Sequence, residues 1–427
     1  MLTLPDEGHK TPQTPAAPAP PVWLVICLAF LTMVIFGTSL QGIPVLYPFI
    51  QSDLALSNSQ VGMLTSALMV TGIFIGLLAG WLADVYGVKK VVLLSLFGTA
   101  AVMAVLPFTG SFIMLLLAVT MIGTISTPIM PATSITITGW IPRRILGFAM
   151  SFKETGFSVG GAITAAALPA LALALGWRMA GGTISLLVVL VAVVFWVYYR
   201  DAPVKNGSPA MFSLSDFVRN VKIIIRNRSL AVIFSWGAVF AGLQWVFMSY
   251  FLLFLVKDIG ISPVLAGGIL SLSQILSSVG RVFWGAVSDS KLFRNNRIMI
   301  PAIIGVIATL TLFGISLMGA GVNMVFVYIM AAATGLSVLS WAGIVITIVS
   351  ERAEPDKVGI TTGLVLTLNR ISIVAMPPLF GWLIDASGSY GAGWQMAAGL
   401  ALLTTLVILI FGRQSTRPRL TPEHKAG

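Results

Sequence analysis

The chain alternates long apolar runs with short polar breaks along most of its length. A helix needs about 20 mostly apolar residues to cross the hydrocarbon core of a bilayer, and such runs recur throughout the sequence. Their limits predict twelve spans, at residues 22–45, 58–83, 88–108, 111–139, 145–172, 177–199, 229–257, 263–288, 298–318, 322–349, 358–386 and 390–412. The pattern therefore predicts an all-α integral membrane protein with 12 transmembrane helices.

Polar segments divide these spans into two sets of six. Residues 1–21 are rich in proline and predict a disordered N-terminal tail. Residues 200–228 form a long polar interruption and predict a cytoplasmic linker, and residues 413–427 predict a C-terminal tail. The sections between them, 22–199 and 229–412, are the two predicted bundles.

The two bundles repeat each other in sequence. At an offset of 205 residues, Gly62 aligns with Gly267 and Asp84 aligns with Asp289. Such a repeat indicates a duplication, which predicts two pseudo-symmetric six-helix bundles. In transporters built this way, the substrate site lies where the halves meet.

Composition and charge support a membrane location and suggest an orientation. Apolar residues make up 57% of the 427 residues and charged residues only 9%. Most of the 25 lysines and arginines fall in tails and breaks on one side of the predicted spans. Since basic loops resist translocation, we expect a multi-pass protein of the cell (inner) membrane with both termini in the cytoplasm. The net charge of +11 then reflects topology and contact with anionic headgroups, which argues against nucleic-acid binding.

Residues for metal or cofactor chemistry are scarce. The two histidines, His9 and His424, lie in the tails, and the one cysteine, Cys27, lies in the first span. We therefore expect no metal, no cofactor and no enzyme activity. The sequence also lacks a phosphate-binding loop, which argues against an ATP-driven pump.

A glycine-rich segment with one acidic and two basic residues ends the second span. It reads Gly80-Trp-Leu-Ala-Asp84-Val-Tyr-Gly87-Val-Lys89-Lys90 and resembles the loop signature of the major facilitator superfamily. The resemblance covers residues 22–412 and implies a gate, in which Gly80 permits close helix contact, Gly87 a tight turn, and Asp84 an ion pair across the interface. Asp289 is part of a partial echo in the second half. Alternatively, Asp84 beside two lysines is only a solvated cap and a topology signal.

Four ionisable side chains lie deep inside predicted spans: Lys153, Glu154, Arg281 and Arg370. A charge there costs roughly 2.5 to 3.5 kcal/mol, so each residue is a candidate for function. Three of the four are cations, and a cavity that they share would attract an anion. The guanidinium of Arg281 can meet a carboxylate through two hydrogen bonds, although it could also reach the membrane surface or join helices.

The segment Arg281-Val-Phe-Trp-Gly285-Ala-Val-Ser-Asp289 is similar to span eight of oxalate/formate antiporters and, more loosely, of monocarboxylate transporters. This similarity implies that Arg281 contacts an anionic substrate and that Arg370 is a second cationic contact, so that the two could clamp a dianion. Monocarboxylate transporters keep an aspartate about three turns above this arginine, where the chain has Leu270. Their proton coupling therefore cannot be carried over.

Lys153 and Glu154 are neighbours in the fifth span. Adjacent helix positions differ by about 100°, which predicts that the two side chains occupy different faces. Glu154 is the one carboxylate deep enough to carry a coupling proton, and Lys153 is a candidate for substrate binding. Both could instead pair with other charges and lock helices together.

Spans one and seven carry the same polar residues at related positions. Gln41 and Gln244 form one pair, and Tyr47 and Tyr250 form the other. These four side chains are candidates to line a substrate cavity from both halves, or else they are satisfied interface residues.

Together these features predict a secondary active transporter of a small organic anion, a mono- or dicarboxylate, that works by alternating access with proton symport or anion exchange. Its expected partners are that anion, protons or a counter-anion, and the lipid bilayer, and we expect a monomer. The alternative is proton-coupled efflux of drugs or other amphipathic compounds. Gly147, Gly156 and Gly160 match the spacing of the signature found in drug/proton antiporters, but Gly161 replaces its proline. A receptor or scaffold without transport activity is a third possibility.

Overall fold

The computed structural model describes residues 20–73, 75, 82–83, 85–202, 228–293, 296–352 and 358–412, and the regular secondary structure in these ranges is helical. The helices of the first half are α1 (Val22–Val45), α2 (Tyr47–Leu54), α3 (Asn58–Val70), α5 (Val88–Val105), η1 (Leu106–Phe108), α6 (Phe112–Ser126), α7 (Ile129–Trp140), η2 (Arg143–Ile145), α8 (Leu146–Leu175) and α9 (Trp177–Tyr198). Those of the second half are α11 (Arg228–Lys257), α12 (Pro263–Asp289), α13 (Met299–Ser316), α14 (Met324–Leu336), α15 (Ala342–Arg352), α16 (Val358–Ser387) and α17 (Tyr390–Phe411).

Within the described ranges, 10 helical stretches are long and apolar enough to cross a bilayer. They correspond to ten of the spans predicted from the sequence. The other two predictions are residues 58–83, of which the structure describes α3 and a few further positions, and residues 322–349, which contain α14 and α15. The helical membrane fold is confirmed, and the count of twelve spans stays a prediction.

Two predicted spans are not continuous helices. Residues 111–139 divide into α6 and α7 at Thr127 and Pro128, and residues 322–349 divide into α14 and α15. Proline has no N–H to donate to the preceding turn, which accounts for the first break. The apolar pattern that predicts these spans indicates which residues lie in lipid but does not show whether a helix is interrupted.

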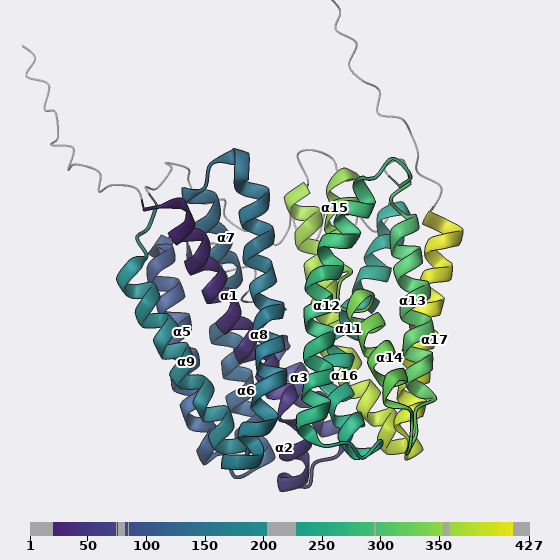
Figure 1. Ribbon diagram of the computed structural model, residues 1–427. Helices are drawn as coiled ribbons and strands as arrows, with labels where there is room; N and C mark the ends of the chain where they lie inside the picture. The colour runs from purple at the N-terminus through teal and green to yellow at the C-terminus, as the bar shows by residue number, and fades with distance from the viewer. Residues whose placement is uncertain are drawn as a thin grey trace, which may run out of the picture.

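The helices run side by side in two bundles, purple to teal for the first half and green to yellow for the second (Figure 1). The start of α1 and the end of α17 lie at the same end of the molecule, which we call the terminal end (Figure 1). The bundles meet at the opposite end, which we call the closed end, and their ribbons stand apart at the terminal end.

Small residues let the two bundles approach each other closely. A Cβ built on Gly62 of α3 would overlap the backbone at Pro377 of α16, and one built on Gly267 of α12 would overlap the carbonyl of Ala165 in α8. Only glycine permits backbones to pack at this distance. The two main helix pairs of the interface are therefore α3 with α16 and α8 with α12.

Candidate functional site

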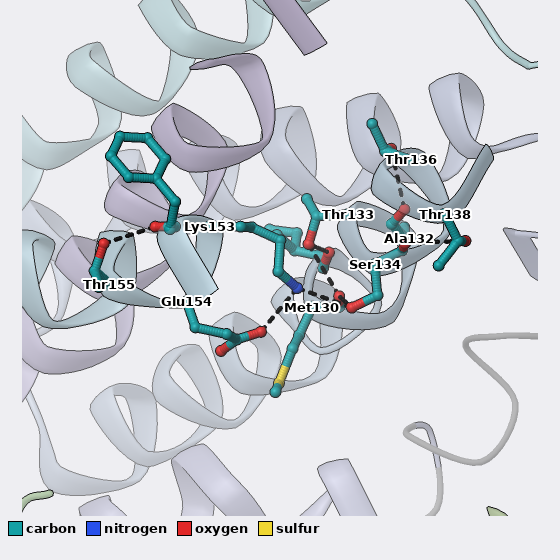
Figure 2. Close-up of polar contacts among 11 residues, drawn as sticks. Met130, Ala132, Thr133, Ser134, Thr136, Thr138, Lys153, Glu154 and Thr155 are labelled. Carbon is teal, nitrogen blue, oxygen red and sulfur yellow. Dashed lines mark hydrogen bonds and ion pairs between the residues drawn. The ribbon is translucent and has the colours of Figure 1, made fainter. Parts of the chain in front are cut away.

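The side chains of Lys153 and Glu154 meet on α8, beside α7 (Figure 2). Nζ of Lys153 lies 2.8 Å from Oε1 of Glu154 and donates a hydrogen bond of 2.8 Å to Oγ of Ser134. Their exposure differs as expected for neighbouring helix positions: the side chain of Lys153 is 0% exposed and that of Glu154 is 38% exposed. Their pairing was not predicted from the sequence, because long side chains on different faces can turn toward each other beyond Cβ.

Arg281 of α12, in the other half, is near enough to Glu154 for their opposite charges to attract each other across the interface. Glu154 lies 8 residues after Leu146, where α8 begins, and Arg281 lies 8 residues before Asp289, where α12 ends. Successive spans alternate in direction, so both residues lie about 12 Å from the terminal end of their helices. Opposite charges from the two halves therefore occur at one depth.

Part of the Arg281 side chain is not satisfied by the protein. Its Nε has no hydrogen-bond partner among the described residues, and the same holds for Oγ of Ser278, about one turn away on α12. A buried donor without a partner is costly, and a guanidinium has five N–H donors to place. This position can accept a bound carboxylate.

The two glutamines predicted to line a cavity make protein contacts. Gln41 donates from Nε2 to the carbonyl of Phe157, at 2.9 Å, and accepts a hydrogen bond from Nε2 of Gln274. The contact between Gln41 of α1 and Gln274 of α12 joins the two halves. Gln244 of α11 accepts a 2.9 Å hydrogen bond from Nε1 of Trp341, within the second half.

Tyr47 and Tyr250, the other predicted pair, are fully buried toward the closed end. The Tyr47 hydroxyl is 2.8 Å from Oγ1 of Thr65, which in turn is 2.8 Å from Oγ of Ser249 in α11. The Tyr250 hydroxyl lies 2.8 Å from the carbonyl oxygen of Asn58, in the first half. Both tyrosines therefore belong to hydrogen-bond networks that cross the interface.

Arg370 occupies α16 and is half-buried. Its guanidinium lies against Gly72, where a Cβ would collide with Nη1. The neighbouring Asn369 is buried, and its Oδ1 has no hydrogen-bond partner among the described residues. Arg370 thus reaches the first half at the α16 interface, as Arg281 does at the α12 interface.

Among the residues predicted to form a gate, Gly80 and Asp84 lie outside the described residues. Gly87, directly before α5, has a φ of 84°, a positive value that glycine adopts readily. The backbone N–H of Lys89 donates to Oδ1 of Asp201 at 2.8 Å, a partner that sequence reasoning missed, and Lys90 is exposed.

Asp289, the predicted echo of Asp84, pairs within its own half. Its Oδ1 lies 2.7 Å from Nη2 of Arg297, whose Nη1 lies 2.8 Å from Oε1 of Glu351. Arg297 therefore joins Asp289 at the end of α12 to Glu351 near the end of α15.

A carboxylate near the end of α16 joins the halves at the closed end. Oδ1 of Asp385 accepts hydrogen bonds of 2.9 Å from the backbone and side-chain nitrogens of Asn58, and Oδ2 accepts from the N–H and hydroxyl of Ser59 at 2.8 and 2.6 Å. Asp385 thereby caps the first turn of α3 from the other half. We call Asp385, Asn58 and Ser59 the Asp385 latch. Sequence reasoning missed it, and the only signal available was an acidic residue near the end of a predicted span.

Comparison with known proteins gives one family and several relatives. The family described as the Major Facilitator Superfamily matches residues 28–376. The hexuronate transporter of Bacillus subtilis (strain 168) is 23% identical, over 91% of this chain and 94% of that protein. A protein of the same organism named "Probable galactarate/D-glucarate transporter" is 23% identical over 91% of each chain. A solved bacterial homolog of the human lysosomal transporter Spinster, in an inward-facing and occupied conformation, covers 95% of this chain and 100% of its own, with a TM-score of 0.77 and 16% identity, which shows similarity of fold.

Proposed function

Because the chain belongs to the major facilitator superfamily, we propose that it is a secondary active transporter of a small organic anion, a mono- or dicarboxylate, that works by alternating access. The family and the relatives make it a transport protein and not an enzyme. Relatives named for hexuronate and for galactarate and D-glucarate support an organic acid as the cargo. These acids carry one or two carboxylates on a polar carbon chain.

The observation that carries the proposal is the incompletely paired guanidinium of Arg281 beside the interface. Carboxylates accept hydrogen bonds from arginine in pairs, which supplies both charge and geometry. Arg370 reaches the interface from α16 and is proposed as the second cation, for the other end of a dicarboxylate. Gln41 and Gln244 are proposed as polar contacts nearer the closed end.

Glu154 is proposed as the coupling residue. It is half-buried and interacts electrostatically with Arg281, so it can neutralise that guanidinium when no cargo is bound. A cargo carboxylate competes with Glu154 for Arg281, and a proton on Glu154 removes the competitor. Proton symport and anion exchange are both consistent with this competition.

Alternating access is supported by the interface. The hydrogen bonds that join the halves through Tyr250 and the Asp385 latch lie at the closed end, and the ribbons stand apart at the terminal end (Figure 1). With both termini in the cytoplasm, as proposed from the basic loops, this conformation faces inward. A monomer in the inner membrane and a gate that includes Asp84 complete the proposal.

The test is exchange of labelled D-glucuronate or D-glucarate by purified protein in vesicles that contain the same unlabelled acid. Arg281→Ala is expected to lower exchange at least about tenfold, because a hydrogen bond to a charged group contributes roughly 1.5 to 3 kcal/mol. Lys291→Ala removes an exposed lysine just beyond the same helix and should exchange like the wild type.

Equal exchange by the wild type and Arg281→Ala would exclude the proposed anion site. If the wild type exchanges neither acid but accumulates ethidium in response to a proton gradient, the organic-anion proposal is wrong and efflux replaces it.

A further inference from the structure

The ammonium group of Lys153 is already occupied by the protein. It has three N–H donors, and Glu154 and Ser134 each lie 2.8 Å from Nζ (Figure 2). None of the side chain is exposed, although this is a position where an isolated cation would be very costly. Two of its three donors are therefore engaged, and Glu154 already serves as its counter-ion.

Glu154, unlike Lys153, has a partly exposed side chain. Its side chain is 38% exposed, and it acts electrostatically on Arg281 across the interface. Lys153 holds one carboxylate oxygen, Oε1, which restricts where a flexible glutamate can place its charge. Ser134, on the neighbouring α7, in turn holds the ammonium.

We propose that Lys153 is a positioning residue, which, anchored by Ser134, holds the Glu154 carboxylate back from a full ion pair with Arg281 and does not itself bind cargo. This inference rests on the proposed function, in which Arg281 binds the anion and Glu154 competes for it. It replaces the expectation from sequence that Lys153 is a substrate contact.

Removing the charge of Lys153 alone and removing the charges of both Lys153 and Glu154 should have different effects on the KM of exchange. Without the ammonium, the Glu154 carboxylate is free to turn toward Arg281 and becomes a stronger competitor of the cargo. When residue 154 is glutamine, no competing charge remains. A buried ion pair can be replaced by two neutral residues at little cost, whereas loss of one partner leaves an unpaired charge.

The experiment measures exchange of labelled D-glucuronate by the full-length protein in vesicles. Lys153→Met is expected to raise the KM of exchange about tenfold with a smaller change in maximum rate. Adding Glu154→Gln to that variant is expected to return KM to within about twofold of the wild type. The effects of substituting two residues that contact each other are not additive. Variants that carry Glu154→Gln should lose accumulation driven by a proton gradient, because the proposed coupling carboxylate is absent.

A residue that binds cargo would behave differently. If Lys153 contacted the anion, the double variant would keep the raised KM of Lys153→Met, and this outcome would overturn the positioning role. A Glu154→Gln protein that still accumulates cargo with the proton gradient would contradict the coupling proposal while leaving this comparison intact.

If the wild type exchanges no D-glucuronate, the proposed function is wrong, but the positioning role of Lys153 can still be tested. The test is then the reactivity of the Glu154 carboxyl group. Dicyclohexylcarbodiimide modifies carboxyl groups within membrane proteins, and mass spectrometry locates the product. Freed from the ammonium, Glu154 is expected to be labelled several-fold more in Lys153→Met than in the wild type, with Glu351 as internal reference. Equal labelling would overturn the inference.

Discussion

At the scale of single residues, the absence of a side chain at Gly72 makes room for the charge of Arg370. A Cβ there would collide with Nη1, so we expect Gly72→Ala to displace the guanidinium. The KM of D-glucarate exchange should rise about threefold to tenfold, and that of D-glucuronate, which has one carboxylate for Arg281, should change less. Gly268→Ala is the control, because nothing lies within 4 Å of a Cβ at that position. Equal changes for the two acids would contradict a role for Arg370 with dianions.

The same scale shows what sequence can predict about a site. The high cost of charge in lipid is enough to single out Lys153, Glu154, Arg281 and Arg370 as candidates from the sequence. It could not predict that Lys153 and Glu154 form a pair, because helix geometry fixes the direction of Cβ but not the end of a long side chain. Nor could it predict that Gln41 bonds to α8 and α12, since that depends on how helices pack.

At the scale of helices, the Asp385 latch connects the end of α16 to the start of α3. Asp385→Asn would place an amide nitrogen against the donors of Asn58 or Ser59, and we expect the closed end to open more often. Opening is measured with a cysteine placed at Ser249, which is buried behind the closed end. The rate at which an impermeant maleimide labels Ser249→Cys, in a protein that also carries Cys27→Ala, reports how often this end opens. We expect a rise of about tenfold for each ~1.4 kcal/mol lost.

Asp53→Asn is the matched control for the latch. Asp53 belongs to α2, near the same end, but pairs with Arg178 inside the first half, at 2.7 Å. Its replacement should leave the labelling of Ser249→Cys unchanged. A similar rise in both variants would mean that loss of any carboxylate loosens this end, and the latch would have no specific role.

Sequence predicted the helices themselves better than their interruptions. The span at residues 22–45 coincides with α1, since a run of apolar residues fixes how much chain lies in lipid. The latch escaped prediction because its partners, Asp385 and Asn58, are 327 residues apart in the sequence. Only packing of α16 against α3 brings them together.

At the scale of the whole molecule, both ends of the helical core lie at one end of the structure (Figure 1). We expect green fluorescent protein to be fluorescent when fused to either terminus, and alkaline phosphatase, which needs disulfides, to be inactive there. Fusions truncated after Gly319, between α13 and α14, should show the opposite pattern. Active phosphatase at the C-terminus would reverse the proposed orientation.

The position of the Asp385 latch also affects the apparent affinity for cargo that arrives from each face of the membrane. A solute that arrives at the closed end can bind only those molecules in which the latch has opened, so its apparent dissociation constant increases as that fraction falls. Each ~1.4 kcal/mol in favour of closure weakens apparent affinity from that face tenfold, while arrival at the terminal end is unaffected. One binding site would therefore show two apparent affinities, and a single carboxylate far from the cargo would set their ratio.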